Sequence, residues 1–118
     1  MLTERQADVL RRLSIGDPVT VQGLLGARDD EPGMLGQRLA CLVRLGGIVL
    51  LSPSQPAFER EVRGARDAGA SIDEVLAVLF TMAPIAGGAL LTSAAPKVAM
   101  ALGYDVEFAL EGLDTPAG

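Results

Sequence analysis

The stretch "SIDEVLAVLFTMAPIAGGALLTSAAP", residues 71–96, decides the fold class of this chain. It opens with a capping box, in which Ser71 can accept the backbone N–H of Glu74 while the Glu74 carboxylate accepts the backbone N–H of Ser71. Acidic residues in a first turn also complement the helix dipole. Because no period-two alternation of apolar and polar residues follows, we expect a helix that begins at residue 72.

The same stretch contains residues that interrupt helices. Proline lacks an N–H and clashes with the preceding turn, so we expect this helix to end near residue 82, with a break or a new helix at Pro84 and again at Pro96. Ser93 is a candidate cap for the piece at Pro96. The Gly87–Gly88 pair lacks the strand, the spacing and the lysine of a phosphate loop, and we interpret it as a site of close helix packing.

Residues 75–96 carry no charge over 22 positions, which is long enough to cross a bilayer. The prolines, the glycine pair, the flanking acids and the lack of an aromatic belt argue against a membrane span. We therefore interpret the segment as helical pieces that pack in a core or between subunits, and we expect no membrane partner.

Composition favours one all-helical domain. The chain has 118 residues, 49% of them hydrophobic but only 3% aromatic, so its core must be built from small aliphatic side chains. The net charge of −5, with no basic stripe, argues against a nucleic-acid partner. We predict an all-α fold of about six helices, and the expected segments besides residues 71–101 are 3–14 (capped by Thr3), 19–25, 34–51, 56–68 (capped by Ser52 with Gln55, or by Ser54) and 106–112 (capped by Asp105).

Whole classes of chemistry are missing from the residue inventory. The chain has no histidine and one cysteine, Cys41, which excludes the usual neutral-pH general base, the common metal sites and a C-x-x-C redox pair. Cys41 lies in the apolar run 34–51 and is interpreted as a small hydrophobe. We expect no cofactor and no metal. The N-terminus has no signal-peptide pattern, so we expect a cytoplasmic protein.

Glu61 stands out on the helix expected over residues 56–68. At 100° per residue, Phe58, Val62 and Ala65 form the packing stripe, and Glu61 falls about 40° from Ala65, on the inward shoulder. Ser54 lies close to Glu61 by the same count. Glu61 is therefore a candidate acid–base residue, or one half of a buried or interfacial salt bridge.

The other candidate residues lie outside that helix. Arg38 and Arg44, the only charges in the run 34–51, are candidate ion-pair partners for Glu61 or anchors for an anionic substrate. Lys97 and Tyr104 are further acid–base candidates, although surface lysines and tyrosines at the edge of a core are much commoner.

The segment 35–113 resembles the carboxymuconolactone decarboxylase-like family, which includes the alkylhydroperoxidase D-type proteins. The resemblance rests on the order of "LGQRLACLVRLGGIVL", "EVRGARDAGASIDEVLAVL" and "APIAGGALLTSAAPKVAMALG". Its most family-like parts are the A-x-x-x-G-A-S-x-D-E run from Ala65 to Glu74 and the A-P-x-x-G run from Ala83 to Gly87. Residues 1–33 would then be an N-terminal helical extension, and residues 34–113 the family core, within a single domain.

The resemblance implies an alkylhydroperoxidase D-like helical bundle that forms a homo-oligomer, a trimer or a hexamer, with helices packed between subunits. Redox members of the family carry C-x-x-C and a histidine where this chain has Ser54, Ala57 and Glu61. Thiol peroxidase chemistry of that kind is therefore excluded.

Two functions remain as hypotheses. In the first, the chain is a cofactor-free decarboxylase, isomerase or lactone-handling enzyme of catabolic or secondary metabolism, acting on a small anionic substrate. Its site residues would be Glu61 as general acid–base, Ser54 or Tyr104 as hydrogen-bond donor, and Arg38 or Arg44 as anchor. In the alternative, the chain is a non-catalytic oligomeric binding or assembly protein that has lost the ancestral peroxidase or decarboxylase site.

Overall fold

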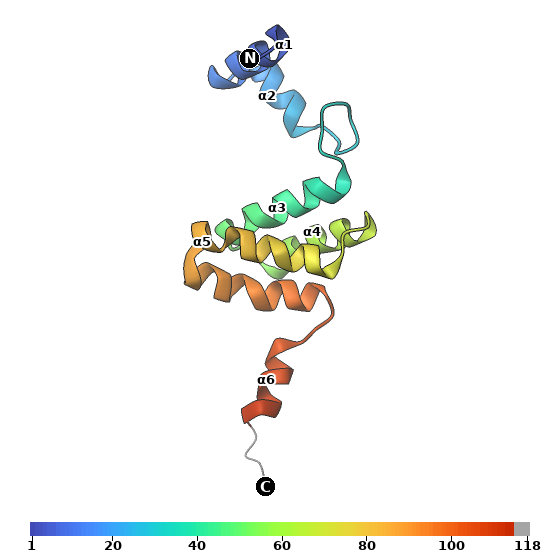
Figure 1. Cartoon of the computed structure of the whole chain (residues 1–118), viewed down its shortest axis with the longest axis vertical. Helices are drawn as coiled ribbons and strands as arrows, with labels where there is room; N and C mark the ends of the chain where they lie inside the picture. The colour runs from blue at the N-terminus through green and yellow to red at the C-terminus, as the bar shows by residue number, and fades with distance from the viewer. Residues whose placement is uncertain (115–118) are drawn as a thin grey trace. The chain divides into compact units, whose positions relative to one another are not determined.

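The computed structural model describes the backbone of residues 1–114 and the side chains of residues 1–111. Within these residues there is no strand, and the helices are α1 (Glu4–Ser14), α2 (Pro18–Leu25), α3 (Gln37–Leu51), α4 (Gln55–Asp67), α5 (Ile72–Ala101) and α6 (Val106–Asp114) (Figure 1). The prediction of an all-α fold with about six helices is confirmed. The chain divides into two compact units, Met1–Met34 and Leu35–Gly118.

The first unit consists of two well-capped helices without a core. Thr3 caps α1 as expected, since its hydroxyl accepts the Gln6 backbone N–H at 3.1 Å and the Gln6 side-chain oxygen accepts the Thr3 backbone N–H. Asp17 caps α2 by accepting the backbone N–H and the hydroxyl of Thr20, and these two hydrogen bonds lower the pKa of Asp17. No residue of α1 or α2 is buried.

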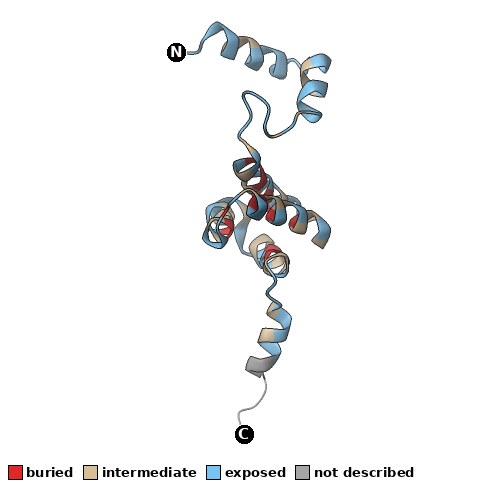
Figure 2. Cartoon of the chain, turned by 90° about the vertical axis from the view of Figure 1, so that its right-hand side faces the viewer, coloured by how far each residue is buried: buried red, intermediate tan, exposed pale blue. Residues whose placement is uncertain are grey.

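The second unit contains the hydrophobic core, which lies where α3, α4 and α5 meet (Figure 2). Each helix contributes small or branched side chains, and one aromatic ring is fully enclosed. The buried members are Leu45 and Val49 from α3, Phe58 and Val62 from α4, and Val75, Leu79, Ala94 and Val98 from α5. A smaller cluster of Cys41, Ala65 and Ala70 extends the contact between α3 and α4.

Helix α3 is buried on one side only. Because the run 34–51 is apolar almost all round, it is expected to form a buried helix, but Leu39 and Val43 are exposed, as are Leu50 and Leu51 near the end of the helix. The buried side approaches α4 closely at Gly64, where an added Cβ would lie 2.7 Å from the Cys41 Sγ. Cys41 therefore fills the space that the missing side chain of Gly64 leaves, in agreement with its interpretation as a small hydrophobe.

Helix α4 begins differently from the expected Ser52–Gln55 capping box. Ser52 ends α3 in a left-handed conformation with φ of 49°, and Ser54 takes the N-cap position without a side-chain cap hydrogen bond. The Gln55 side chain instead donates to the backbone carbonyl of Lys97 at 2.8 Å. The expected Ser52–Gln55 capping box is therefore absent, and the Gln55 side chain makes a contact that is distant in the sequence.

Helix α5 is a hairpin of two antiparallel limbs, residues 72–86 and 88–101, that turn back on each other at Gly87 (Figure 1). The predicted break at Pro84 is therefore misplaced, and Pro96 and Ser93 lie inside the second limb rather than at its start. Gly87 has φ of 79° and ψ of 169°, a conformation that is open essentially to glycine alone. A proline weakens a helix but does not supply this conformation, so the glycine determines where the chain reverses.

Among the described residues, α5 is long and apolar enough to span a membrane by length and composition alone, with a mean hydropathy of 2.0 over an 18-residue window. The reversal at Gly87 leaves limbs of about 15 residues each, and a spanning helix needs about 20.

The Ser71–Glu74 capping box that starts α5 is present as predicted, with hydrogen bonds of 3.0 Å in both directions. Asp105 caps α6, also as predicted, by accepting the Phe108 N–H at 3.1 Å.

Candidate functional site

Glu61 lies on α4 between the buried residues Phe58, Val62 and Ala65, and its side chain is partly buried. It makes no hydrogen bond or ion pair with any residue that the structure describes. Ser54, seven residues earlier, is exposed at the N-terminus of the same helix. Since i and i+7 lie on one side of a helix, these two candidates share a face of α4.

Arg38 does not pair with Glu61, which corrects one of the two partners predicted for that acid. The Arg38 guanidinium pairs with the Glu74 carboxylate, so that it joins α3 to the start of α5. Their side chains are 39% and 42% exposed, so the pair is worth at most about 1 kcal/mol. Glu74 has two roles, because its other carboxylate oxygen completes the capping box of α5.

Arg44 and Tyr104 are both exposed, on different elements of the second unit. Arg44 lies on α3 and interacts with the rest of the chain. Tyr104 follows α5, with a side chain that is 58% exposed and a backbone N–H that donates to the Ala99 carbonyl at 2.9 Å. Within residues 1–111, no hydrogen bond or ion pair brings Tyr104 to Glu61 or Ser54.

An apolar groove of about 420 Å³ runs between α3 and the first limb of α5. Its walls are apolar except for Glu74 at one end and Thr81, and the lining residues are Leu39, Leu42, Val43, Gly46, Glu74, Ala77, Val78, Thr81 and Met82. None of the five predicted site residues lines this groove. Its volume falls within the range of small-molecule sites, but its lack of convergent polar groups does not fit a catalytic centre.

A smaller hollow of about 220 Å³ lies where the start of α4, the second limb of α5 and the start of α6 meet. It differs from the groove because charged and polar side chains line it. Its residues are Gln55, Ser93, Pro96, Lys97, Met100, Asp105, Val106 and Glu107. This hollow is where polar side chains from three helices converge.

Lys97 is the cation of this hollow. Its ammonium donates to the Pro53 carbonyl at 2.8 Å and lies 5.5 Å from the centre of the Phe58 ring. The carbonyl accepts a hydrogen bond and the aromatic face attracts a cation, so both contacts help to fix the position of the side chain. The sequence singled out Lys97 as an acid–base candidate by its residue type alone. Gln55 and Asp105, which also line the hollow, lie 42 and eight positions from Lys97 in the sequence, and no spacing rule brings the three residues together.

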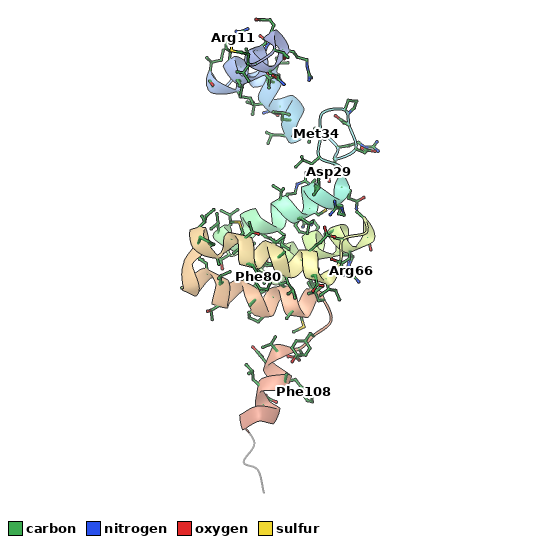
Figure 3. All side chains as sticks on the ribbon, viewed as in Figure 1. Arg11, Asp29, Met34, Arg66, Phe80 and Phe108 are labelled. Atoms are coloured by element: carbon green, nitrogen blue, oxygen red, sulfur yellow. The ribbon has the colours of Figure 1, made fainter. Side chains whose placement is uncertain are left out.

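The outward face of the first limb of α5 is the largest departure from the pattern of a soluble helix. A helix at a protein surface normally turns charged and polar residues outward. From Ala77 to Ile85 the exposed positions are Ala77, Phe80, Thr81, Pro84 and Ile85, none of which is charged, and the exposed charge of this limb is Asp73 in its first turn. Phe80 and Ile85 are 70% and 72% exposed, and Figure 3 shows the Phe80 side chain on this limb.

Chemistry that depends on a metal has no obvious site in the described residues. Among residues 1–111 no group of three or more His, Cys, Asp or Glu side chains could hold a metal ion.

No protein-family model, curated protein or solved structure matches the chain.

Proposed function

We propose that this protein is a homo-oligomeric binding or assembly protein whose subunits pack through the outward face of the first limb of α5. The observation that carries the proposal is the exposure of the most apolar helix of the chain. Only 6% of the most hydrophobic 18-residue window of α5 is buried, although its mean hydropathy is 2.0. Burial of exposed apolar area is the main driving force of association, so a second copy is the expected cover.

The free energy expected from burying these side chains supports the same proposal. Full burial of a side chain such as Phe80 or Ile85 contributes about 1.5–3 kcal/mol each. The exposed charge of the limb, Asp73, lies in its first turn, and between Ala77 and Ile85 a partner subunit would have no charged residue to desolvate. The apolar side of α3 with Leu39 and Val43 continues the exposed apolar surface across the groove.

The test is the mass of a double variant, Phe80→Glu with Ile85→Glu, measured by sedimentation equilibrium. Two carboxylates on this face should dissociate the wild-type oligomer to monomers while the helical circular dichroism signal is kept. Val19→Glu is the matched control, because Val19 is 80% exposed but lies on α2. If the control dissociates the oligomer and the double variant does not, the interface is elsewhere and the proposal is wrong.

We further propose that the chain is a divergent member of the carboxymuconolactone decarboxylase-like family without the redox residues. The expected cytoplasmic location and the trimeric or hexameric state are part of this proposal. The hairpin of α5 and the capping box at Ser71 support it, since both fall within the motif runs from Ala65 to Glu74 and from Ala83 to Gly87.

A cofactor-free enzyme with Glu61 as the acid–base group is the second candidate. It is favoured by one observation: Glu61 is a partly buried carboxylate that has no ion-pair partner among the described residues. A carboxylate held near an apolar core without a cation is a feature of acid–base sites. Ser54 on the same face of α4 is a candidate hydrogen-bond donor, and Tyr104 and Arg44 are the other residues expected of this site.

Glu61→Gln separates this candidate from a structural role. An active-site acid should leave the unfolding free energy within about 0.5 kcal/mol, and loss of one half of a buried salt bridge should cost about 3–5 kcal/mol. Turnover of small lactones and β-keto acids, followed by NMR, should then be lost in the variant. Equal turnover by both proteins, or a large loss of stability, would contradict the enzymatic role.

A further inference from the structure

The polar hollow at the start of α6 contains opposite charges that do not neutralise each other directly. Lys97, whose side chain ends in an ammonium, and Asp105 and Glu107, whose side chains end in carboxylates, are among the residues that line it. No ion pair joins Lys97 to either carboxylate, although all three line the same space. Opposite charges on the walls of one hollow leave room for a molecule that carries both signs.

The donors and acceptors of the wall are only partly used by the protein. The Lys97 ammonium has three N–H donors, of which the Pro53 carbonyl takes one in the described part of the chain. One oxygen of Asp105 caps α6, which leaves its second oxygen for other donors. Glu107 is exposed at the mouth of the hollow in the first turn of α6.

The far wall is held in place by contacts between distant parts of the sequence. The Gln55 amide donates to the Lys97 backbone carbonyl at 2.8 Å, and the Ser52 and Ser93 hydroxyls lie 3.1 Å apart. These contacts and the Lys97–Pro53 hydrogen bond tie the α3–α4 connection to the second limb of α5. The cation is therefore positioned before any ligand arrives, which lowers the entropic cost of binding.

We propose that this hollow binds a small zwitterion, a molecule of amino-acid size with one carboxylate and one ammonium group. The carboxylate would accept hydrogen bonds from Lys97 and Ser93, and the ammonium would donate to Asp105 and Glu107. A volume of about 220 Å³ is large enough for a molecule of amino-acid size. A simple anion would meet two carboxylates and a simple cation would meet Lys97, so neither satisfies the whole wall.

Titration calorimetry with the full-length protein tests the site. The probes are L-alanine and β-alanine, and the single-charge analogues are propionate and ethylamine, each of which lacks one of the two charged groups. At least one of the two amino acids should bind with a Kd of about 1 mM or below, and each analogue should bind at least about tenfold more weakly. Absence of binding by both amino acids, or equal binding by either analogue, would overturn the proposal.

Variants locate the binding in this hollow. Glu107→Gln removes one carboxylate at an exposed position where folding is not at risk, and it should weaken binding about tenfold because charge-assisted hydrogen bonds are the strong ones. Lys97→Met should abolish binding. Glu111→Gln is the matched control on the same helix, since Glu111 does not line the hollow, and it should change the affinity less than about twofold. Unchanged binding in Glu107→Gln, or a larger loss in the control, would contradict the site.

Discussion

Helix α4 and the first limb of α5 pack on the same core, but the exposed surface of α4 is charged and that of the α5 limb is largely apolar. Both bury apolar side chains against α3, Phe58 and Val62 from α4 and Val75 and Leu79 from α5. Outward, α4 carries charged residues: Arg60, Arg63, Arg66 and Asp67 are all exposed. The first limb of α5 presents Phe80, Thr81, Pro84 and Ile85 instead.

The difference separates the requirements of folding from those of association. An apolar stripe on one side is enough to place each helix on the core, and α4 has only that. The second apolar side of α5 contributes nothing to the core of its own chain, because its residues are exposed. We propose that a second copy of the chain covers it, and α4 is the internal control that shows what a solvent-facing helix of this protein looks like.

The inward faces of α4 and of the first limb of α5 should contribute similar amounts to the stability of the fold. Substitutions there should give the largest losses of stability. Phe58→Ala should destabilise the fold by about 3–5 kcal/mol and Leu79→Ala by about 2–5 kcal/mol, since each leaves a cavity in the core. Urea unfolding at one fixed protein concentration measures both, because association would make stability depend on concentration. A cost below about 1 kcal/mol for either would mean that its helix is not held by this core.

The turn of α5 is the next test, because α4 has no equivalent of it. Gly87→Ala should cost about 1–3 kcal/mol, since a side chain is strained at φ of 79°. Gly88→Ala is the matched control: a Cβ there meets no atom within 4 Å, and alanine should stabilise the helix by up to about 1 kcal/mol. Thermal unfolding of the two variants should move in opposite directions, and equal shifts would argue against a hairpin that turns at Gly87.

The N-caps of the two helices give the smallest expected effect. Ser71→Ala removes a hydroxyl that accepts the Glu74 N–H at 3.0 Å, so it should cost about 0.5–2 kcal/mol. Ser54→Ala removes a hydroxyl that makes no cap hydrogen bond, and its effect should stay within about 0.5 kcal/mol. The same urea titration distinguishes them, and a larger cost at Ser54 would reverse the assignment of the caps.

Local signals in the sequence were sufficient for most of the helices. The caps at Thr3, Ser71 and Asp105 were predictable because donor and acceptor lie within three residues of each other. The turn at Gly87 was missed because Pro84 is the stronger helix breaker in isolation, whereas a chain reversal depends on the sign of φ. The cap expected from Ser52 and Gln55 failed because Ser52 ends α3 in a left-handed conformation and α4 begins only at Gln55, after Ser54.

The candidate site was less predictable than the fold. The angular position of Glu61 follows from helix periodicity alone, and its side chain is partly buried. The partner of Arg38 could not be derived in the same way, because the Arg38–Glu74 pair depends on how α3 crosses α5. The hollow around Lys97 likewise requires three helices to meet, and no local pattern in the sequence encodes that meeting.

The central claim, that a second copy covers the outward face of α5, is tested most directly by the mass of the wild-type protein in solution. Static light scattering on the size-exclusion peak, without detergent and over a range of protein concentrations, gives that mass. If a second copy covers this face, the mass should be an integer multiple of the 12.2 kDa chain, at least twice that value, with no detergent requirement. A monodisperse species of 12.2 kDa at all concentrations would contradict it.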